Sequence, residues 1–360
     1  MDSVIFGAGI AGLMSAITLR AQGHRCRIYE RSRHAHDAGM GFILMPEGID
    51  RLQSFGVHLT GALGGVPLDR YCCRDAAGQI LHEETMPAGA RSIRRRDLIA
   101  AMMRALPADG TLIFDAELDD LEFDETGQVR SARLSSGLRI EADLYVAADG
   151  IKSRARKAMF PGWPAAEAQV LEIVGLARSE NAVRWANNNF NKFHALDGGL
   201  ALGVLPVNAD EVIWYLQFDP QRFLPPKENP ESKRAFLHKL IGDWAEPIPH
   251  LLTVSDFSHV HIWRPVDTDL VPRFHRRNLV LTGDAAHPLL PFTSRGVSSA
   301  IADAVALGGL LSDQGNVEEA LSGYSRERRQ QCAPYIAKGR ELTQNFLGPQ
   351  LAGNLMVPVA

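Results

Sequence analysis

Three glycines near the N-terminus, Gly7, Gly9 and Gly12, stand between an apolar strand and an apolar helix. Gly7 allows a tight turn, Gly9 lets the backbone approach a pyrophosphate, and Gly12 lets the helix pack closely on the strand. Glu30 ends the next strand, where its carboxylate can accept hydrogen bonds from both hydroxyls of a ribose and would repel a 2′-phosphate. The segment therefore predicts a site for the adenosine half of a dinucleotide. The adjacent Arg31 either covers that site or lies solvated on the surface.

Two later segments each end a buried strand with an Asp and a Gly. Asp149 and Gly150 follow the apolar run LYVAA, and Asp284 follows Gly283 after the strand 278–282. An aspartate at the carboxyl end of a parallel strand can accept hydrogen bonds from a polyol chain. The glycine turn alone does not separate FAD from NAD. The two Asp-bearing strand ends favour FAD, whose ribitol is such a chain.

The segment after Asp284 combines a rigid loop with a helix start. Pro291 stiffens the loop, and Gly296 opens an apolar helix that we expect over 297–311. The positive end of this helix would stabilise the negative charge on a reduced flavin by about 0.3–2 kcal/mol. Arg295 either stabilises that charge, clamps a substrate carboxylate, or leans into water.

The elements that would position these residues follow from hydrophobic periodicity and from glycine and proline signals. The patterns predict strands at 3–6, 26–30, 111–118, 129–135, 138–147 and 278–282. They predict a helix that follows the turn 7–12 and ends at about Gln22, and further helices at 94–106 and 297–311. Between about 165 and 265 the pattern changes to short β-like runs, a Pro-rich link and a helix near 232–245. We therefore predict an α/β protein with a Rossmann-like FAD-binding domain and an inserted α+β substrate domain that carries a mostly antiparallel sheet.

These changes of pattern also predict the domain boundaries. The FAD-binding domain is discontinuous and comprises residues 1–70, 90–164 and 266–345. The substrate domain comprises 71–89 and 165–265, and 346–360 form a C-terminal tail.

The strand 211–218 is the most informative part of the substrate domain. Alternation places Trp214 on one face and Tyr215 and Gln217 on the other, and periodicity does not say which face lines the pocket. Trp214 is more often a core residue than a substrate platform. The candidate residues of the substrate pocket are His194, Trp214, Gln217, Pro291 and Arg295. No side chain is assigned as a general base, because a flavin can carry the oxygen chemistry itself.

Composition excludes several classes of function. The net charge of −4 gives no support for a nucleic-acid or anionic-membrane partner, and no apolar run is long enough to span a bilayer. The early first strand leaves no room for a signal peptide, and the four cysteines suit buried thiols in a reducing compartment, so we expect a cytoplasmic protein. The pairs His34/His36 and His259/His261 lack a third ligand, so no metal is assigned.

The three motifs, in this order, resemble those of the class A FAD-dependent monooxygenases, the family with the para-hydroxybenzoate hydroxylase fold. The resemblance extends from Gly7 to the arginine-rich segment that ends at Arg329, and the G-D-A-A-H-x-x-x-P segment is the most specific part. It implies FAD bound noncovalently, with NADH or NADPH as a transient reductant. It also implies dioxygen as co-substrate and hydroxylation of a small aromatic or polyketide-like metabolite through a flavin C4a-hydroperoxide.

The resemblance also implies roles for individual residues. The pyrophosphate would be held by Gly9, Ile10, Ala11 and Gly12, and the adenosine ribose by Glu30. Arg95 matches an arginine that contacts FAD, with Arg96 as the near alternative, and Leu118 matches a backbone position beside the adenine. Asp149 and Gly150 match a second dinucleotide motif, and Asp284 matches the acid that binds the ribitol. Next to the isoalloxazine ring the matching residues are Pro291, Gly296, Val297 and Ser298.

One departure from the family pattern concerns the loop after Pro291. The family reads G-x-G-x-N where this chain has Ser294-Arg295-Gly296-Val297-Ser298. This departure motivates two alternatives: a FAD-dependent reductase or dehydrogenase that inserts no oxygen, and a flavin-binding subunit without turnover. The sequence leaves the substrate, the preference between NADH and NADPH, and the oligomeric state open.

Overall fold

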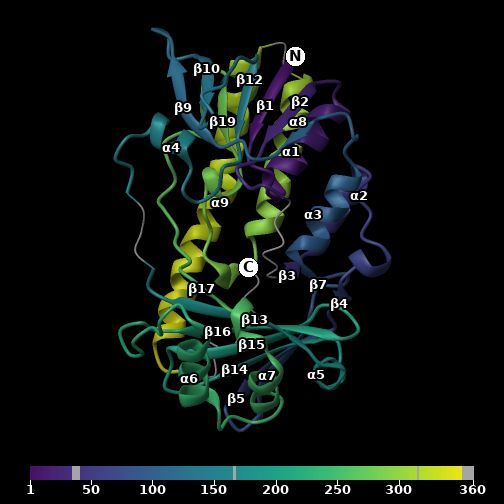
Figure 1. Ribbon diagram of the computed structural model, residues 1–360, viewed down its shortest axis with the longest axis vertical. Helices are drawn as coiled ribbons and strands as arrows, with labels where there is room; N and C mark the ends of the chain where they lie inside the picture. The colour runs from purple at the N-terminus through teal and green to yellow at the C-terminus, as the bar shows by residue number, and fades with distance from the viewer. Residues whose placement is uncertain (35–40, 165–167, 314–315, 351–360) are drawn as a thin grey trace.

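The computed structural model describes residues 1–34, 41–164, 168–313 and 316–350, which form an upper and a lower domain (Figure 1). The upper domain contains a six-stranded sheet. In spatial order its strands are β18 (His275–Arg276), β19 (Leu279–Leu281), β12 (Leu144–Ala147), β1 (Asp2–Phe6), β2 (Arg25–Tyr29) and β8 (Leu112–Ile113). All neighbouring strands are parallel except β18 and β19.

Two buried helices pack against each other on this sheet. They are α1 (Ile10–Ala21) and α8 (Gly296–Asp313), and the hydroxyl of Thr18 on α1 donates to the carbonyl of Ala304 on α8 at 3.0 Å. The remaining elements of the upper domain are α2 (Pro46–Ser54), α3 (Arg95–Arg104), α4 (Arg154–Met159), the sheet β3 (Gly41–Leu44), β7 (Arg91–Arg94) and β4 (Val66–Pro67), and the meander β9 (Leu118–Phe123), β10 (Val129–Leu134) and β11 (Arg139–Ile140).

The lower domain is built on a seven-stranded sheet. Its order is β17 (His261–Trp263), β13 (Leu171–Arg178), β16 (Glu211–Phe218), β15 (Leu200–Pro206), β14 (Asn189–His194), β5 (Arg70–Asp75) and β6 (Ile80–Thr85). All pairs are antiparallel except β14 and β5. The helices α5 (Glu180–Ala186), α6 (Pro230–Ile241) and α7 (Ile248–Val254) cover the lower face in Figure 1, and the other face points toward the upper domain.

One long helix connects the two domains. In Figure 1, α9 (Val317–Leu347) runs from the upper domain down to the lower sheet. Leu321 and Tyr324 near its start belong to the core of the upper domain. Phe346 near its end packs with Val170 and Ala201 of the lower domain. Within the described segments, every helix is too short or too polar to span a lipid bilayer.

The predicted fold class is confirmed, with corrections at element boundaries. The predicted strand 111–118 is two elements, because Asp115 adopts a left-handed φ of 55° that separates β8 from β9. The predicted strand 138–147 is also two elements, β11 in the meander and β12 in the parallel sheet. The predicted tail does not begin at 346, since α9 continues to Leu347 and the carbonyl of Phe346 accepts a hydrogen bond from Gly199 N at 2.7 Å. Residues 351–360 of the predicted tail lie outside the described residues.

Candidate active site

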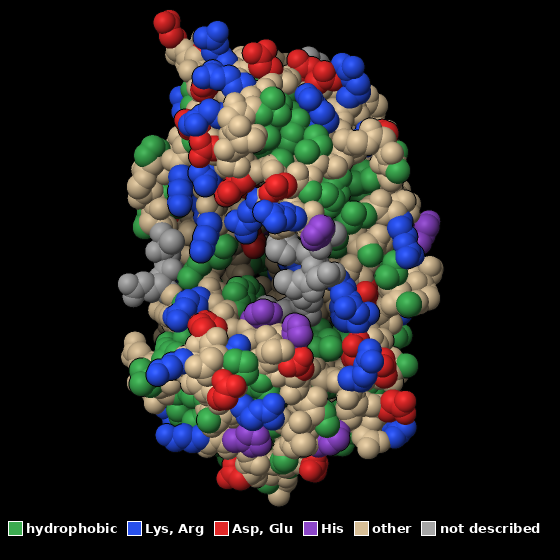
Figure 2. All heavy atoms as spheres, in the orientation of Figure 1, with side chains coloured by type: hydrophobic (Ala, Val, Ile, Leu, Met, Phe, Trp, Pro, Cys, Tyr) green, Lys and Arg blue, Asp and Glu red, His purple; other side chains and the backbone are tan. Residues whose placement is uncertain are grey.

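The carboxyl ends of four parallel strands meet at one edge of the upper sheet. In the strand register Phe6 lies opposite both Tyr29 and Ala147, and Ala147 lies opposite Leu281. Segments that are far apart in the sequence therefore leave the sheet side by side, and they carry Gly7, Glu30, Asp149 and Asp284. Figure 2 shows the surface hollowed between the two domains, with Lys and Arg side chains gathered above the hollow.

The glycine turn is packed too tightly for side chains at two of its three positions. A Cβ at Gly7, which has a φ of 100°, would lie 2.4 Å from the carbonyl oxygen of Ala148. A Cβ at Gly12 would lie 1.9 Å from the carbonyl oxygen of Gly7. At Gly9, in contrast, the nearest atom is a guanidinium nitrogen of Arg95 at 3.5 Å. The backbone at Gly9 is therefore open to a ligand, as a phosphate site requires.

Helix α1 begins with its N–H groups available. Its N-cap residue is Gly9, which has no side chain to accept hydrogen bonds from the first turn. The N–H groups of Ile10, Ala11 and Gly12 therefore lack a capping side chain. Such a helix N-terminus binds anions, because the unpaired donors and the helix dipole both favour negative charge.

Glu30 is a buried acid that also shapes the glycine turn. Its carboxylate accepts hydrogen bonds from Ala8 N at 2.7 Å and from Ser32 N at 2.9 Å. A carboxylate oxygen can accept more than one hydrogen bond, so these two bonds do not by themselves prevent contact with a ribose. The neighbouring Arg31 is exposed, and Leu118 is buried in the core of the upper domain.

Arg95 is a half-buried cation placed over the glycine turn. It starts α3 and lies near both Glu30 and Asp284. Burial lowers its pKa, although these two acids oppose the shift. Its guanidinium makes no hydrogen bond within the part of the chain that the structure describes. The alternative, Arg96, is exposed and lies 3.7 Å from Asp97, so the geometry favours Arg95 as the phosphate-binding residue.

Asp149 lies at the end of β12 and caps the next helix. One of its oxygens accepts a hydrogen bond from Arg154 N at 2.7 Å, and the other is buried without a partner among the described atoms. Burial raises the pKa of this carboxyl group above its ordinary value. Gly150 has a φ of 78°, and no heavy atom lies within 4 Å of the Cβ position. This turn is therefore open on one side.

Asp284 is an exposed residue whose carboxyl group nevertheless has the raised pKa that is typical of a buried acid. Its carboxylate is accessible, yet burial raises its pKa, although nearby cations oppose the shift. Both observations fit a carboxylate that opens on a hollow within the protein. Gly283 brings this loop against α1, since a Cβ there would lie 2.8 Å from the Cβ of Ala11. Arg156 fixes the loop by donating to the carbonyls of Asp284 and Ala285, both at 2.8 Å.

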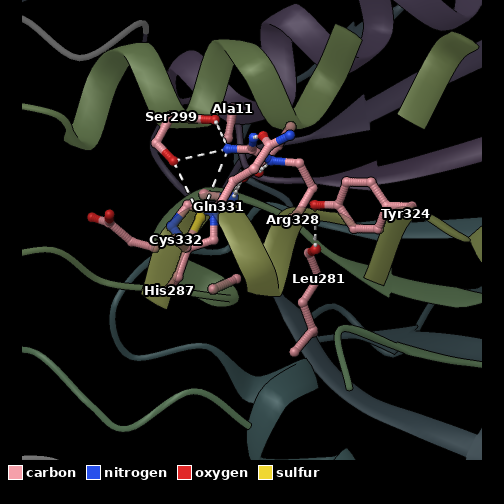
Figure 3. A network of polar contacts seen from close by, with 12 residues as sticks. Ala11, Leu281, His287, Ser299, Tyr324, Arg328, Gln331 and Cys332 are labelled. Carbon is pink, nitrogen blue, oxygen red and sulfur yellow. Dashed lines mark hydrogen bonds and ion pairs between the residues drawn. The ribbon is translucent and has the colours of Figure 1, made fainter. Parts of the chain in front are cut away.

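A network of buried polar residues lies behind this loop (Figure 3). One carboxylate oxygen of Asp303, on α8, accepts from Gly283 N and is bonded to His287 Nε2, each at 2.7 Å. Its other oxygen accepts from Arg328 Nε, on α9, at 2.6 Å. Asp303 therefore holds both ends of the segment that carries Asp284, while Arg328 supplies the opposite charge.

The pKa values in this network follow from its charges. Burial disfavours charge on His287, but the carboxylate of Asp303 outweighs it and raises the pKa of His287 well above its ordinary value. Burial alone would raise the pKa of Asp303, but His287 and Arg328 lower it below the ordinary value. His287, Arg328 and Asp303 are therefore all ionised, as two cations that share one carboxylate, rather than poised for proton transfer.

Besides the two histidine pairs seen in the sequence, the structure brings three potential metal ligands together. The ligand atoms of His287, Asp303 and Cys332 lie within 4.8 Å of one another. The guanidinium of Arg328 already bonds this carboxylate and lies 3.7 Å from the Cys332 sulfur, so a second cation would be repelled. Of the two sequence pairs, His259 is bonded to Asp256 at 2.7 Å, and His36 lies outside the described residues.

The loop after Pro291 explains one departure from the family pattern. Ser294 adopts a left-handed φ of 52°, a conformation that glycine adopts at lower cost. The turn is therefore kept although the glycine is replaced. Arg295 forms an ion pair with Glu47 of α2 and lies 5.7 Å from the centre of the Tyr335 ring. Neither of these partners was predicted.

The first turn of α8 carries the other predicted flavin-contacting residues. Gly296 and Val297 are half-buried, and nothing lies within 4 Å of the Cβ position at Gly296. Ser298 occupies the position of the missing asparagine, and its hydroxyl is buried without a partner in the described chain. A Cβ at Gly48 on α2 would lie 3.1 Å from that hydroxyl, so a larger residue at 298 would meet α2.

Trp214 does not line the site, and its inclusion among the pocket residues is wrong. Its ring is buried on the face of the lower sheet that packs against α6 and α7. Its indole N–H donates to Ser255 Oγ at 2.7 Å, and its ring lies 6.3 Å from that of Phe257. The alternation of β16 then places Tyr215 and Gln217 on the opposite face, toward the upper domain.

That opposite face carries charged residues that sequence reasoning missed. Lys192 and Glu172 are buried there beside the two predicted residues His194 and Gln217. The ammonium of Lys192 lies 5.6 Å from the centre of the ring of Phe292, in the Pro291 loop. Glu172 stands among apolar residues of β13, where a charge is costly to bury, and this was the available signal; β14 is mixed in polarity and gave none for Lys192.

Three other residues were missed, and the same signal applies to one of them. Asp303 is the only charged residue in the first 17 residues of the apolar helix α8, and a lone buried acid requires a partner. Arg156 and Arg328 lie in basic segments, for which the sequence alone predicts side chains that face solvent.

The geometry of these residues, without reference to any related protein, suits the binding of FAD. An uncapped helix N-terminus, an open glycine and a guanidinium without hydrogen bonds lie together and suit a diphosphate. Asp284 opens on the hollow beyond them, where it suits a polyol.

Comparisons with known proteins agree with this geometry. The sequence pattern of the FAD binding domain family matches residues 1–337. The 3-amino-4-hydroxybenzoate 2-monooxygenase of Streptomyces cremeus is 27% identical, with 95% of this chain and 86% of that protein aligned. The kynurenine 3-monooxygenase of Salinispora arenicola is 29% identical, with 91% and 76% aligned.

A solved structure shares the fold. The crystal structure of HpxO from Klebsiella pneumoniae, complexed with FAD and uric acid, superposes with a TM-score of 0.86 at 23% identity and covers 97% of this chain and 90% of that one. The family match spans both domains and all three motifs. The chain therefore belongs to the FAD binding domain family and is a class A FAD-dependent monooxygenase.

Proposed function

We propose that FAD lies along the carboxyl edge of the upper sheet and that a small aromatic substrate lies between the Pro291 loop and the lower sheet. In this arrangement the diphosphate contacts the first turn of α1 and Arg95, and Glu30 binds the adenosine ribose. Asp284 binds the ribitol, and the first turn of α8 faces the isoalloxazine ring. With the domain boundaries that we propose from the sequence, this substrate position lies at the junction of the two domains.

One observation carries the position of the substrate. The two faces of the lower sheet differ: one is an apolar core around Trp214, and the other presents buried polar groups to the loop that carries Phe292. Both ring nitrogens of His194 and the amide oxygen of Gln217 have no partner among the described residues, and a buried face with such unpaired groups suits a small ligand with a few hydrogen-bonding groups. His194 and Gln217 are retained as substrate-contacting residues, together with Pro291.

The names of the relatives support the substrate class. They describe enzymes for 3-amino-4-hydroxybenzoate and for kynurenine, and the neighbouring crystal structure contains uric acid. Each of these compounds is a small ring system with polar substituents. We propose a substrate of the same kind, either an aromatic or a polyketide-like metabolite.

The protein's own residues have positioning and electrostatic roles in this proposal. FAD, when bound, supplies electron transfer from NADH or NADPH and the activation of dioxygen. The first turn of α8 offers N–H groups to the negative edge of the reduced ring. Packing of the lower sheet over the site would exclude water, which limits side reactions of reactive intermediates. No side chain is required as a general base.

The reductant would bind transiently, because the described chain has one glycine-turn dinucleotide unit and that unit serves FAD. We also propose a cytoplasmic location, since all four cysteines are buried free thiols.

The test is a screen of NADH and NADPH oxidation across small aromatic compounds with the FAD-loaded enzyme. Product from each positive reaction is then made under isotopically labelled dioxygen and weighed by mass spectrometry. We expect substrate-stimulated oxidation and label in the product. Oxidation without label would support the reductase alternative, and no stimulation by any compound would support a binding subunit.

A further inference from the structure

Four polar residues occupy two neighbouring rows on the upper face of the lower sheet. In the first row Glu172 on β13 pairs with Gln217 on β16, and Ala201 on β15 joins Gln217 to His194 on β14. In the next row Lys192 on β14 lies two residues from His194 and therefore on the same face. All four polar side chains are buried.

The hydrogen-bonding groups in these rows are only partly satisfied. Gln217 Nε2 donates to Glu172 Oε1 at 2.6 Å. The amide oxygen of Gln217 and both ring nitrogens of His194 are buried without a partner in the described chain. Lys192 likewise makes no hydrogen bond to any described residue, and its ammonium lies over the ring of Phe292. Buried polar groups in native proteins are normally paired, so this cluster lacks a ligand.

The charges of the cluster are also incomplete. Cys73 on the neighbouring strand β5 and Glu172 on β13, three strands away across the sheet, are the titratable groups whose charges act on Lys192. Burial lowers the pKa of Lys192 to about 8 and raises that of Glu172 to about 7. Burial also lowers the pKa of His194 well below its ordinary value and raises that of Tyr215, so both are neutral at pH 7. The ammonium therefore has a counter-ion that burial keeps partly protonated.

We propose that Lys192 binds an anionic oxygen of the substrate, so that the substrate is a small aromatic carboxylate. This inference rests on the proposed function, because it uses the same junction between the Pro291 loop and the lower sheet. Gln217 and His194 complete the site with an acceptor and ring nitrogens for a hydroxyl or amino substituent. Phe292 contacts the same ammonium and links the carboxylate position to the loop next to the flavin.

The test compares acids with their neutral amides. Benzoate and a set of hydroxy- and aminobenzoates, each with its matching benzamide, are titrated into the FAD-loaded oxidised enzyme, and binding is measured from the change in flavin absorbance. We expect each acid that binds to do so about 10- to 100-fold more tightly than its amide, as for a charge-assisted hydrogen bond. Lys192→Met should remove this preference without loss of FAD.

A matched control is available in the same domain. Lys233 on α6 is also a buried lysine, and its ammonium donates to the carbonyl of Val260 on the side of the sheet away from the flavin. Lys233→Met should therefore keep the acid preference of the parent enzyme. In the parent enzyme the preference should decline as the pH rises through about 8, because Lys192 then loses its proton.

Three outcomes overturn the inference: amides that bind as tightly as acids, an acid preference that survives Lys192→Met, or a panel in which no acid changes the flavin spectrum. The labelled-dioxygen assay tests the proposed function separately from the role of Lys192. If a neutral aromatic compound supports incorporation of labelled oxygen, the monooxygenase assignment stands while the role of Lys192 falls.

Discussion

The sharpest stability prediction concerns Asp303→Asn. This carboxylate bonds Gly283 and His287 through one oxygen and Arg328 through the other, in a region without solvent. An asparagine has one acceptor oxygen, so it leaves either the loop or Arg328 without its bond. It also removes the only negative charge that His287 and Arg328 share within this network. Removing one partner of a buried ion pair costs about 3–5 kcal/mol, and we expect a loss of about 3 kcal/mol in the free energy of unfolding.

The same substitution should weaken FAD binding although Asp303 does not face the hollow. The segment that carries Asp284 is held at both ends by Asp303, so a looser segment should lower FAD affinity on the order of 10-fold. Denaturant unfolding of the flavin-free protein and quenching of FAD fluorescence measure the two effects. Glu319→Gln is the matched control, because Glu319 is an exposed acid on α9.

The pH dependence gives an independent check. The pKa of Asp303 is lowered in the fold, so its contribution is present above about pH 4 and is lost as the pH falls through the lowered value. The pKa of His287 is raised, so its contribution is complete below about pH 6.5 and is lost as the pH rises through the raised value. The difference between parent and variant should therefore be largest between about pH 4 and 6.5. A difference below about 0.5 kcal/mol there would refute the reasoning.

Three further substitutions test the flavin site. Asp284→Ala should remove a charge-assisted hydrogen bond of about 1.5–3 kcal/mol and weaken FAD about 10- to 100-fold, and full retention of FAD through gel filtration would contradict this role. Arg95→Met should weaken FAD by a similar factor while Arg96→Met leaves it unchanged, and equal dissociation constants for the two variants would argue against the choice of Arg95. Ser294→Gly should keep the unfolding free energy within about 1 kcal/mol, whereas Ser294→Val should lower it by about 1–2 kcal/mol, as read from denaturant midpoints; equal midpoints would mean that the loop relaxes out of the left-handed conformation.

The sequence predicted the elements whose ends carry motifs better than it predicted the others. The strand at 3–6, the glycine turn and the helix that follows were found, because spacing and backbone conformation coincide there. The division of 111–118 and of 138–147 was missed, because hydrophobicity continues through a chain that changes sheets. Only the backbone at Asp115 and the pairing of β12 with β1 reveal the break.

The site was predicted where a motif names a residue and missed where partners come from elsewhere. Asp284 and Glu30 follow strands and are recognisable from that position alone. Arg95 was chosen over Arg96 by similarity, and the structure supplies a physical reason, because only Arg95 lies over Gly9. The ion pair between Asp303 and Arg328 joins two different helices, which sequence patterns do not bring together. The alternation of β16 allowed either face to line the pocket, and only the packing of α6 and α7 on one face decides between them.

The long C-terminal helix has a mechanical consequence. Helix α9 contributes Leu321 and Tyr324 to the core of the upper domain and Phe346 to a cluster in the lower domain. Unfolding of either domain should therefore also disrupt α9 and the packing of the other domain. The two halves should therefore melt in one cooperative transition rather than in two steps. Access for substrate should then depend on small movements of surface loops instead of a wide swing of one half against the other.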